Sequence, residues 1–147
     1  TQVICDSEKV VGLVISYPGR LMKFLELPMA LQLLRMLGLV RFGQFLRRAF
    51  PLIGLKEAMD DEYFISNIAV PPTQRQNGLG HFLLEQIENQ ARSQGYKKIA
   101  LTVDVENERA FSLYQRVGFA RLDTVTIARL KKSIQYAGYH RMRKSLG

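Results

Sequence analysis

The sequence predicts one mixed α/β domain, and three observations carry this prediction. The chain has 147 residues, the size of a single domain, and 47% of them are apolar, which is enough to form a core. Along the chain, the hydrophobic pattern first predicts two strands and then helices. After that it predicts strands and helices in alternation. Glycine and proline are scattered along the chain, so no segment has the composition of a disordered or repetitive region.

The N-terminal third predicts a β-hairpin followed by helices. Residues 2–6 and 10–17 are β-rich with a short polar turn between them, which favours antiparallel pairing. Residues 21–55 are dominated by Leu, Met and Phe with spaced basic residues, which predicts two or three short helices. The expected breaks between these helices lie at prolines and glycines: Pro28, Gly38 or Gly43, and Pro51.

A strand and an amphipathic helix come next. Residues 63–70 are β-rich and end at two prolines, which predicts a strand of that length. Residues 78–93 predict a helix, because Leu83, Ile87 and Ala91 repeat at helical spacing. Gly95 is the expected C-terminal cap of this helix, since glycine adopts the left-handed conformation at no steric cost.

The C-terminal part predicts three more strands and one more helix. Residues 98–105 form a β-rich run, and Asn107 can accept a hydrogen bond as the N-cap of a helix over residues 108–116. Two further strands are expected, one at about 119–129 and one that includes 139–143. The order of elements therefore predicts a sheet flanked by helices.

The charge and cysteine content limit the classes of partner. The formal net charge of +8 predicts an anionic partner, which could be nucleic acid, a membrane surface or a phosphorylated cofactor. Cys5 is the single cysteine, so an intramolecular disulfide is impossible and a cytoplasmic setting is favoured. No apolar run approaches the roughly 18 residues of a membrane-spanning helix, and no secretory signal is visible.

The segment between the strand at 63–70 and the helix at 78–93 is the first candidate site. A polar loop with Gly78 and Gly80 leads directly into the helix, whose first N–H groups and dipole attract phosphate oxygens. The two glycines allow close approach to the backbone, and Arg75 adds a fixed positive charge. From these residues alone, a phosphate-binding loop and an ordinary strand-to-helix connection both remain open.

Two common phosphate-binding motifs are absent from the sequence. A dinucleotide fingerprint needs a third glycine, and position 83 is Leu. The Walker loop needs a Gly-Lys-Ser/Thr sequence, which the chain lacks. No zinc-ligand set and no recognised DNA- or RNA-binding motif is present either, so no nucleic-acid partner and no metal are expected.

Two motifs resemble those of the GNAT (Gcn5-related) N-acetyltransferase superfamily. The sequence Arg75-Gln76-Asn77-Gly78-Leu79-Gly80 is similar to the family's R-x-x-G-x-G/A signature. Residues 107–119, NERAFSLYQRVGF, resemble its N-x-x-A-x-x-x-Y-x-x-x-G-F segment. The resemblance implies a central, mostly antiparallel sheet flanked by helices, with a helical insertion at about 21–55 in a single domain that spans residues 1–147.

The resemblance also implies a role for individual residues. Backbone groups of Ile68 and Val70 would bind the pantetheine arm of acetyl-CoA, and the Val70 N–H would stabilise an oxyanion. Beside Arg75, the residues whose N–H groups would hold the pyrophosphate are Gln76, Asn77, Gly78, Leu79, Gly80 and His81. Asn107 would contact the pantetheine region, and Tyr114 would protonate the leaving thiolate. Tyr114 could instead be a core aromatic residue, whereas capping by Asn107 is compatible with its implied role.

The activity implied is direct transfer of an acetyl group from acetyl-CoA to an amine in a ternary complex. The alternative is an inactive regulatory module that binds CoA, because the strand at 63–67 lacks the carboxylate that the family often uses as a base. The nearest carboxylates form the turn Asp60-Asp61-Glu62, which is expected to be solvated and to attract a cationic acceptor near its entrance. The expected partners are therefore acetyl-CoA and an amine. A homodimer is expected as well if the helices at 21–55 form an oligomer interface.

The N-terminal half departs from the family pattern. The family usually has a strand and two helices before the hairpin, whereas this sequence starts at the hairpin. Either that start is missing or the helices at 21–55 replace it as a wall of the acceptor groove. Core packing is the main interpretation of residues 21–55, and the alternatives are an oligomer interface, a lid and a membrane-surface helix with interleaved arginines.

Overall fold

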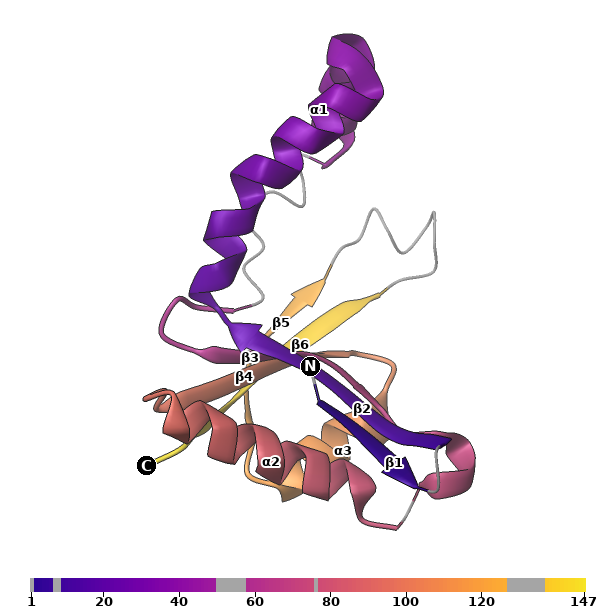
Figure 1. Ribbon diagram of the computed structural model, residues 1–147, viewed down its shortest axis with the longest axis vertical. Coiled ribbons are helices and arrows are strands. Elements are labelled where there is room, and N and C mark those ends of the chain that lie inside the picture. Colours follow the sequence, from indigo (N-terminus) through magenta and orange to yellow (C-terminus); the bar gives the residue numbers. More distant parts are fainter. Residues whose placement is uncertain (1, 7–8, 50–57, 76, 127–136) are drawn as a thin grey trace.

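The computed structural model describes residues 2–6, 9–49, 58–75, 77–126 and 137–147 (Figure 1). Its centre is a six-stranded sheet with the strand order β1-β2-β3-β4-β6-β5. All neighbouring strands are antiparallel except β3 and β4, which confirms the predicted mixed α/β fold with a mostly antiparallel sheet. The elements are β1 (Gln2–Asp6), β2 (Lys9–Pro18), α1 (Arg20–Ala49), β3 (Tyr63–Ala69), α2 (Leu79–Ser93), β4 (Lys98–Asp104), α3 (Glu108–Arg116), β5 (Ala120–Thr126) and β6 (Gly138–Ser145).

The core lies between one face of the sheet and helix α2. Inward-facing strand residues such as Ile99 and Leu101 alternate with residues of the opposite face, as the two-residue period of a strand requires. Leu83 and Ile87 of α2 pack against them and are fully buried, which contributes about 2 kcal/mol for each side chain. Helix α3 lies on the same side of the sheet as α2 (Figure 1), and its residues Ala110 and Phe111 pack against the same core.

The two parallel strands separate after a short paired stretch. Strands β3 and β4 pair only from Tyr63↔Ile99 to Ile65↔Leu101, although both strands continue beyond these residues. A β-bulge occurs at the same point, because Ile15 of β2 pairs with Asn67 and Ser16 pairs with Ile65, which leaves the intervening Ser66 unpaired. A bulge bends its strand, so the end of β3 turns away from β4.

Helix α1 differs from the predicted set of short helices. It runs from Arg20 to Ala49 and is interrupted only at Gly38, whose φ of 70° and ψ of 167° are not helical. Glycine has no Cβ to oppose a positive φ, and this explains why the kink falls there. The break expected at Gly38 or Gly43 is thus confirmed at Gly38, where two helices meet at a kink. The expected break at Pro28 is wrong, since Pro28 lies within the helix, and Pro51 is outside the described residues.

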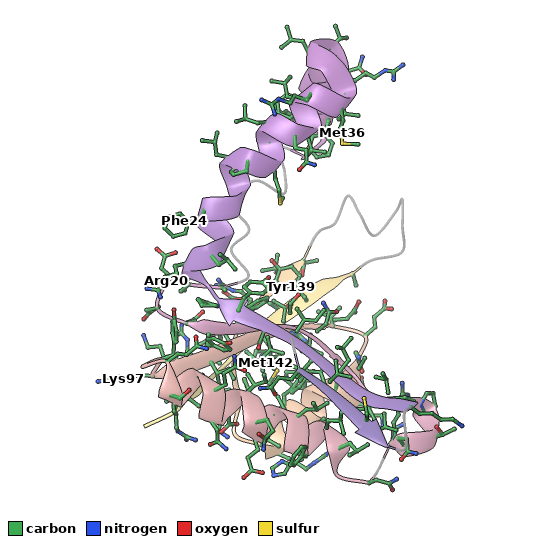
Figure 2. The ribbon with its side chains drawn as sticks, in the orientation of Figure 1. Arg20, Phe24, Met36, Lys97, Tyr139 and Met142 are labelled. Carbon is green, nitrogen blue, oxygen red and sulfur yellow. The ribbon has the colours of Figure 1, made fainter. Side chains whose placement is uncertain are left out.

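Most of α1 projects from the sheet and leaves apolar side chains exposed. Phe24 and Met36 are 73% and 77% exposed, and Figure 2 shows them on the projecting helix, away from the sheet. The interpretation of this region as core is therefore wrong for the described part of α1. No described helix is both long enough and apolar enough to cross a membrane.

The acidic turn before β3 is a structural junction. Glu62 is 2% exposed, accepts a hydrogen bond from the Met59 N–H at 2.8 Å and forms an ion pair with Arg143 of β6. The Glu62 carbonyl accepts a second hydrogen bond from the Gly19 N–H at 2.8 Å, between β2 and α1. Asp61 forms an ion pair with Lys98 at 2.7 Å. The expectation of a solvated, amine-attracting turn is thus wrong for Glu62, and the charge of Asp61 is already balanced.

We predict that Glu62→Gln lowers the free energy of unfolding by about 2 kcal/mol, because Arg143 loses its counter-ion in a partly desolvated position. Chemical denaturation is the measurement. The matched control is Glu85→Gln on the exposed side of α2, which should change stability by less than about 0.5 kcal/mol. Equal stability of the two variants would show that the Glu62 ion pair does not hold the junction together.

Candidate functional site

A cavity opens where β3 and β4 separate. Its volume is about 550 Å³, and it lies at the carboxyl ends of the two parallel strands, where open α/β sheets bind ligands. The end of β3, the loop before α2, the first turn of α2 and one face of α3 form its walls. The lining residues are Ile68, Ala69, Val70, Gln74, Arg75, Gly78, Leu79, Gly80, His81, Asn107, Arg109, Ala110, Leu113, Tyr114 and Arg116.

The first wall is the end of β3 and the turn after it. Ile68 and Val70 flank the last residue of the strand, so their backbone lies along the cavity rather than inside a ladder with β4. A short 3₁₀ turn at Pro72–Gln74 follows and reverses the chain. The Nε of Arg75 donates a hydrogen bond to the Val70 carbonyl at 3.1 Å, which fixes this guanidinium group at the cavity wall.

The second wall is the N-terminus of α2, which no side chain caps. Its N-cap is Gly78, which has no side-chain oxygen, and the Phe82 N–H donates a hydrogen bond to the Gly78 carbonyl at 3.0 Å. The N–H groups of the first turn, from Leu79 to His81, have no acceptor within the helix. Together with the helix dipole, these N–H groups give this wall a positive potential suited to an anion.

Gly78 and Gly80 keep this wall open for different reasons. Gly78 has a φ of 77°, a conformation that residues with a side chain rarely adopt. Gly80 has helical geometry, and a Cβ built there would meet only Leu113 Cδ2, at an ordinary 3.6 Å. Packing within the protein therefore does not require glycine at position 80, whereas a side chain there would occupy the cavity.

The third wall is helix α3, whose N-terminus is capped. The Asn107 side-chain oxygen accepts a hydrogen bond from the Ala110 N–H at 3.1 Å, as the sequence predicted. This bond fixes the start of the helix beside the end of β4. Ala110 and Tyr114, one turn apart, then face the cavity together.

Tyr114 lines the cavity together with Ile68 and Val70. Its ring is partly buried and makes an edge-on contact with Phe119, with ring centres 5.9 Å apart. Burial raises the pKa of the Tyr114 phenol above its usual value of 10.0, because the phenolate would be poorly solvated. Tyr114 therefore keeps its proton at neutral pH and can serve as a hydrogen donor.

The structure brings most of the predicted site residues to this one cavity. Nine of them line it: Ile68, Val70, Arg75, Gly78, Leu79, Gly80, His81, Asn107 and Tyr114. Asn77 adjoins the cavity without lining it, and its side-chain amide lies 3.3 Å from the Gln74 oxygen. Gln76 lies outside the described residues.

The sequence analysis missed two cationic residues of the site, Arg109 and Arg116. They lie on the same face of α3 as Leu113, at helical spacing, and this spacing was the signal that could have identified them. With Arg75 they make the lining cationic, since the described lining residues include no Asp or Glu. Among the described residues, no group of three or more His, Cys, Asp or Glu could hold a metal ion.

Comparison with known proteins gives consistent matches. The model of the acetyltransferase (GNAT) family matches residues 3–119. The [ribosomal protein bS18]-alanine N-acetyltransferase of Escherichia coli (strain K12) is 37% identical over 59 residues, which are 40% of this chain and 40% of that protein. The crystal structure of an N-acetyltransferase from Staphylococcus aureus Mu50 is 28% identical with a TM-score of 0.63, covering 96% of this chain and 67% of that one. A crystal structure described as an acetyltransferase shares the fold, with a TM-score of 0.65 and 24% identity over 99% and 69% of the two chains.

We predict that Asn107→Ala lowers the free energy of unfolding by about 1 kcal/mol through loss of the cap on α3. Asn107→Ser, which restores a capping oxygen, should recover most of this loss in the same denaturation experiment. If Ala and Ser variants are equally stable, the hydrogen bond to Ala110 does not stabilise the helix start.

Proposed function

The chain belongs to the GNAT acetyltransferase family, and from this premise we propose that it transfers an acetyl group from acetyl-CoA to an amine in a ternary complex. One observation carries the proposal: a single cavity joins an uncapped helix N-terminus, the free end of a splayed strand and a protonated tyrosine. The first can bind phosphate, the second can bind an amide-rich arm, and the third can act as an acid. Acetyl-CoA contains groups that match all three.

The residues present fit acetyl-CoA as the donor. The first turn of α2 supplies unpaired N–H groups for the diphosphate, with Arg75 beside it and no side chain on Gly80 to obstruct it. The pantetheine arm carries amides that can pair with the backbone of Ile68 and Val70, in the stretch where β3 has no partner on the β4 side. The thioester then lies toward Tyr114 and Asn107.

The proposed chemistry needs an oxyanion donor and a proton donor. Attack of a neutral amine forms the new N–C bond and places negative charge on the thioester oxygen, for which the Val70 N–H is the donor we assign. Collapse of this intermediate breaks the C–S bond. The phenol of Tyr114 gives its proton to the departing thiolate, and the amine proton leaves to solvent.

The described lining of the cavity offers no carboxylate that could act as the general base, and Glu62 is committed to Arg143. This observation favours water as the base, and it also supports the second candidate, a CoA-binding regulatory module without catalysis. We further propose a cytoplasmic protein, given its single cysteine, and a homodimer that uses the exposed surface of α1.

The decisive experiment measures thiol release from acetyl-CoA in the presence of a panel of acceptors. The panel should include polyamines, lysine side chains, aminoglycosides and peptides with a free N-terminal alanine. Acceptor-dependent release of CoA with a matching acetylated product supports the enzyme. Tight binding of CoA without any acceptor-dependent release across the panel would instead favour the regulatory module.

We predict that Gly80→Leu weakens acetyl-CoA binding at least tenfold while the protein stays folded, because its side chain enters the cavity and not the core. Calorimetric titration with CoA gives the affinity, and thermal unfolding gives the control on folding. Gly43→Leu on α1, where a side chain meets no other atom and which does not line the cavity, should leave CoA affinity unchanged. A folded Gly80→Leu protein with native affinity would place the diphosphate elsewhere.

We predict that Tyr114→Phe lowers kcat on the order of 100-fold with little change in CoA affinity, because the hydroxyl alone is lost. In the unsubstituted protein, the loss of kcat on the basic side should begin only as the pH approaches the raised pKa of Tyr114, above its usual 10.0, since only the protonated phenol donates. The measurement is kcat against pH for both proteins. Native turnover in the Phe variant would mean that water protonates the thiolate.

A further inference from the structure

The part of α1 beyond its kink separates apolar from basic side chains. Gly38 divides α1, and residues 39–49 form its second helical part. The residues of one face are apolar and repeat at helical spacing: Leu39, Phe42 and Leu46. The residues of the opposite face are polar and also repeat at helical spacing: Arg41, Gln44 and Arg47. Residues 39–49 are therefore a basic amphipathic helix, a pattern typical of segments that bind a membrane surface.

Both faces of this helix are available to a partner. Leu39 and Leu46 are exposed, and so are Arg41 and Arg47. Within the part of the chain that the structure describes, neither arginine forms an ion pair, whereas Arg143 of the sheet is paired with a carboxylate. The partner that fits this segment must therefore offer an apolar surface and negative charge side by side.

The charge of α1 favours an anionic lipid surface over other partners. Helix α1 contains six basic residues and one acidic residue, Glu26, so it carries a net charge of +5 out of +8 for the whole chain. Residues 39–49 contain no Asp or Glu. A second copy of this segment would bring like charges together, and nucleic acid offers phosphates without an apolar layer. A bilayer with anionic lipids offers negative headgroups directly above apolar chains.

The position of the segment suits a flat surface. Helix α1 projects from the sheet on the side away from α2 (Figure 1), and Met36, two residues before the kink, lies far from the sheet (Figure 2). Only a protruding element can reach a flat surface before the rest of the domain does. As a helix, residues 39–49 are about 16 Å long. This is shorter than the roughly 30 Å of a bilayer's hydrocarbon core, so the segment fits along the surface and not across it.

We propose that residues 39–49 bind the protein to membrane surfaces that contain anionic lipids. The apolar face enters the boundary between headgroups and acyl chains, and the arginines contact the lipid phosphates. Helix α1 leaves the sheet beside the start of β3, where the Gly19 N–H donates to the Glu62 carbonyl, whereas the cavity lies at the other end of β3. Docking therefore leaves the cavity free and does not depend on the proposed function. The homodimer proposed above has residues 20–37 of α1 available to it.

The test is cosedimentation of the full chain with lipid vesicles. One set contains phosphatidylcholine alone, and the other contains equal parts of phosphatidylcholine and phosphatidylglycerol. The protein should bind the anionic vesicles on the order of 100-fold more tightly, because each basic residue near such a surface contributes about fivefold. Arg41→Gln combined with Arg47→Gln should weaken this binding roughly 30-fold. The control, Lys9→Gln combined with Lys97→Gln, removes the same charge from exposed positions outside α1 and should keep the binding.

A second pair of substitutions tests the apolar face. Leu39→Ala combined with Leu46→Ala should weaken binding to the anionic vesicles at least tenfold, since each methylene group withdrawn from lipid lowers the affinity. Both leucines are exposed, so thermal unfolding should be unchanged, and calorimetric titration should show unchanged CoA affinity. This pair distinguishes docking through the helix from adsorption of a cationic protein by charge alone.

The outcomes that overturn the proposal are specific. Absence of binding to anionic vesicles, or equal binding to both vesicle types, rules out an anionic lipid surface as the partner. Native binding by the leucine variant, or equal losses in the arginine variant and the lysine control, shows adsorption by charge alone. Sedimentation velocity tests the remaining occupant. A dimer in the unsubstituted protein that becomes a monomer in the leucine variant would assign this face to a second copy.

Discussion

The unpaired residue Ser66 in β3 is the constraint on which the site depends. Because the register between β2 and β3 shifts there, β3 bends at the residue where its pairing with β4 ends. Strand β4 stays paired with β6 to its last residue, Asp104, so it cannot follow β3. The backbone at Ile68 and Val70 is thereby released from the sheet on that side, and the cavity exists because a ladder of hydrogen bonds is interrupted there.

The arrangement of the strands also determines which basic residues form ion pairs with carboxylates. On β6, alternate residues Arg141 and Arg143 face away from α2 and pair with Asp123 and Glu62, while Lys144 faces α2 and pairs with Glu88. These pairs neutralise the sheet and join strands that are distant in the sequence. Arg109 and Arg116 of the cavity lining have no such partner among the described residues, so their charges add to the positive potential of the α2 dipole at this site.

Sequence reasoning identified the helix starts because their signals are local. Asn107 caps α3 through a bond only three residues away, and the glycines before α2 act on their own turn. The burial of Glu62 depends on Arg143, 81 residues later, and no local pattern reports such a partner. Helix α1 was misjudged for a related reason, since its apolar composition resembles a core segment whether or not the fold supplies anything to cover it.

The exposed apolar surface of α1 makes the solution behaviour of the protein depend on ionic strength. Like charges keep separate molecules apart at low salt, and six of the basic residues lie on α1 itself, among Leu, Met and Phe side chains. At 1 M salt the screening length falls to about 3 Å, shorter than the contact between two such helices. Repulsion then fades while hydrophobic attraction persists, so colloidal stability is lost under conditions that leave the folded domain intact.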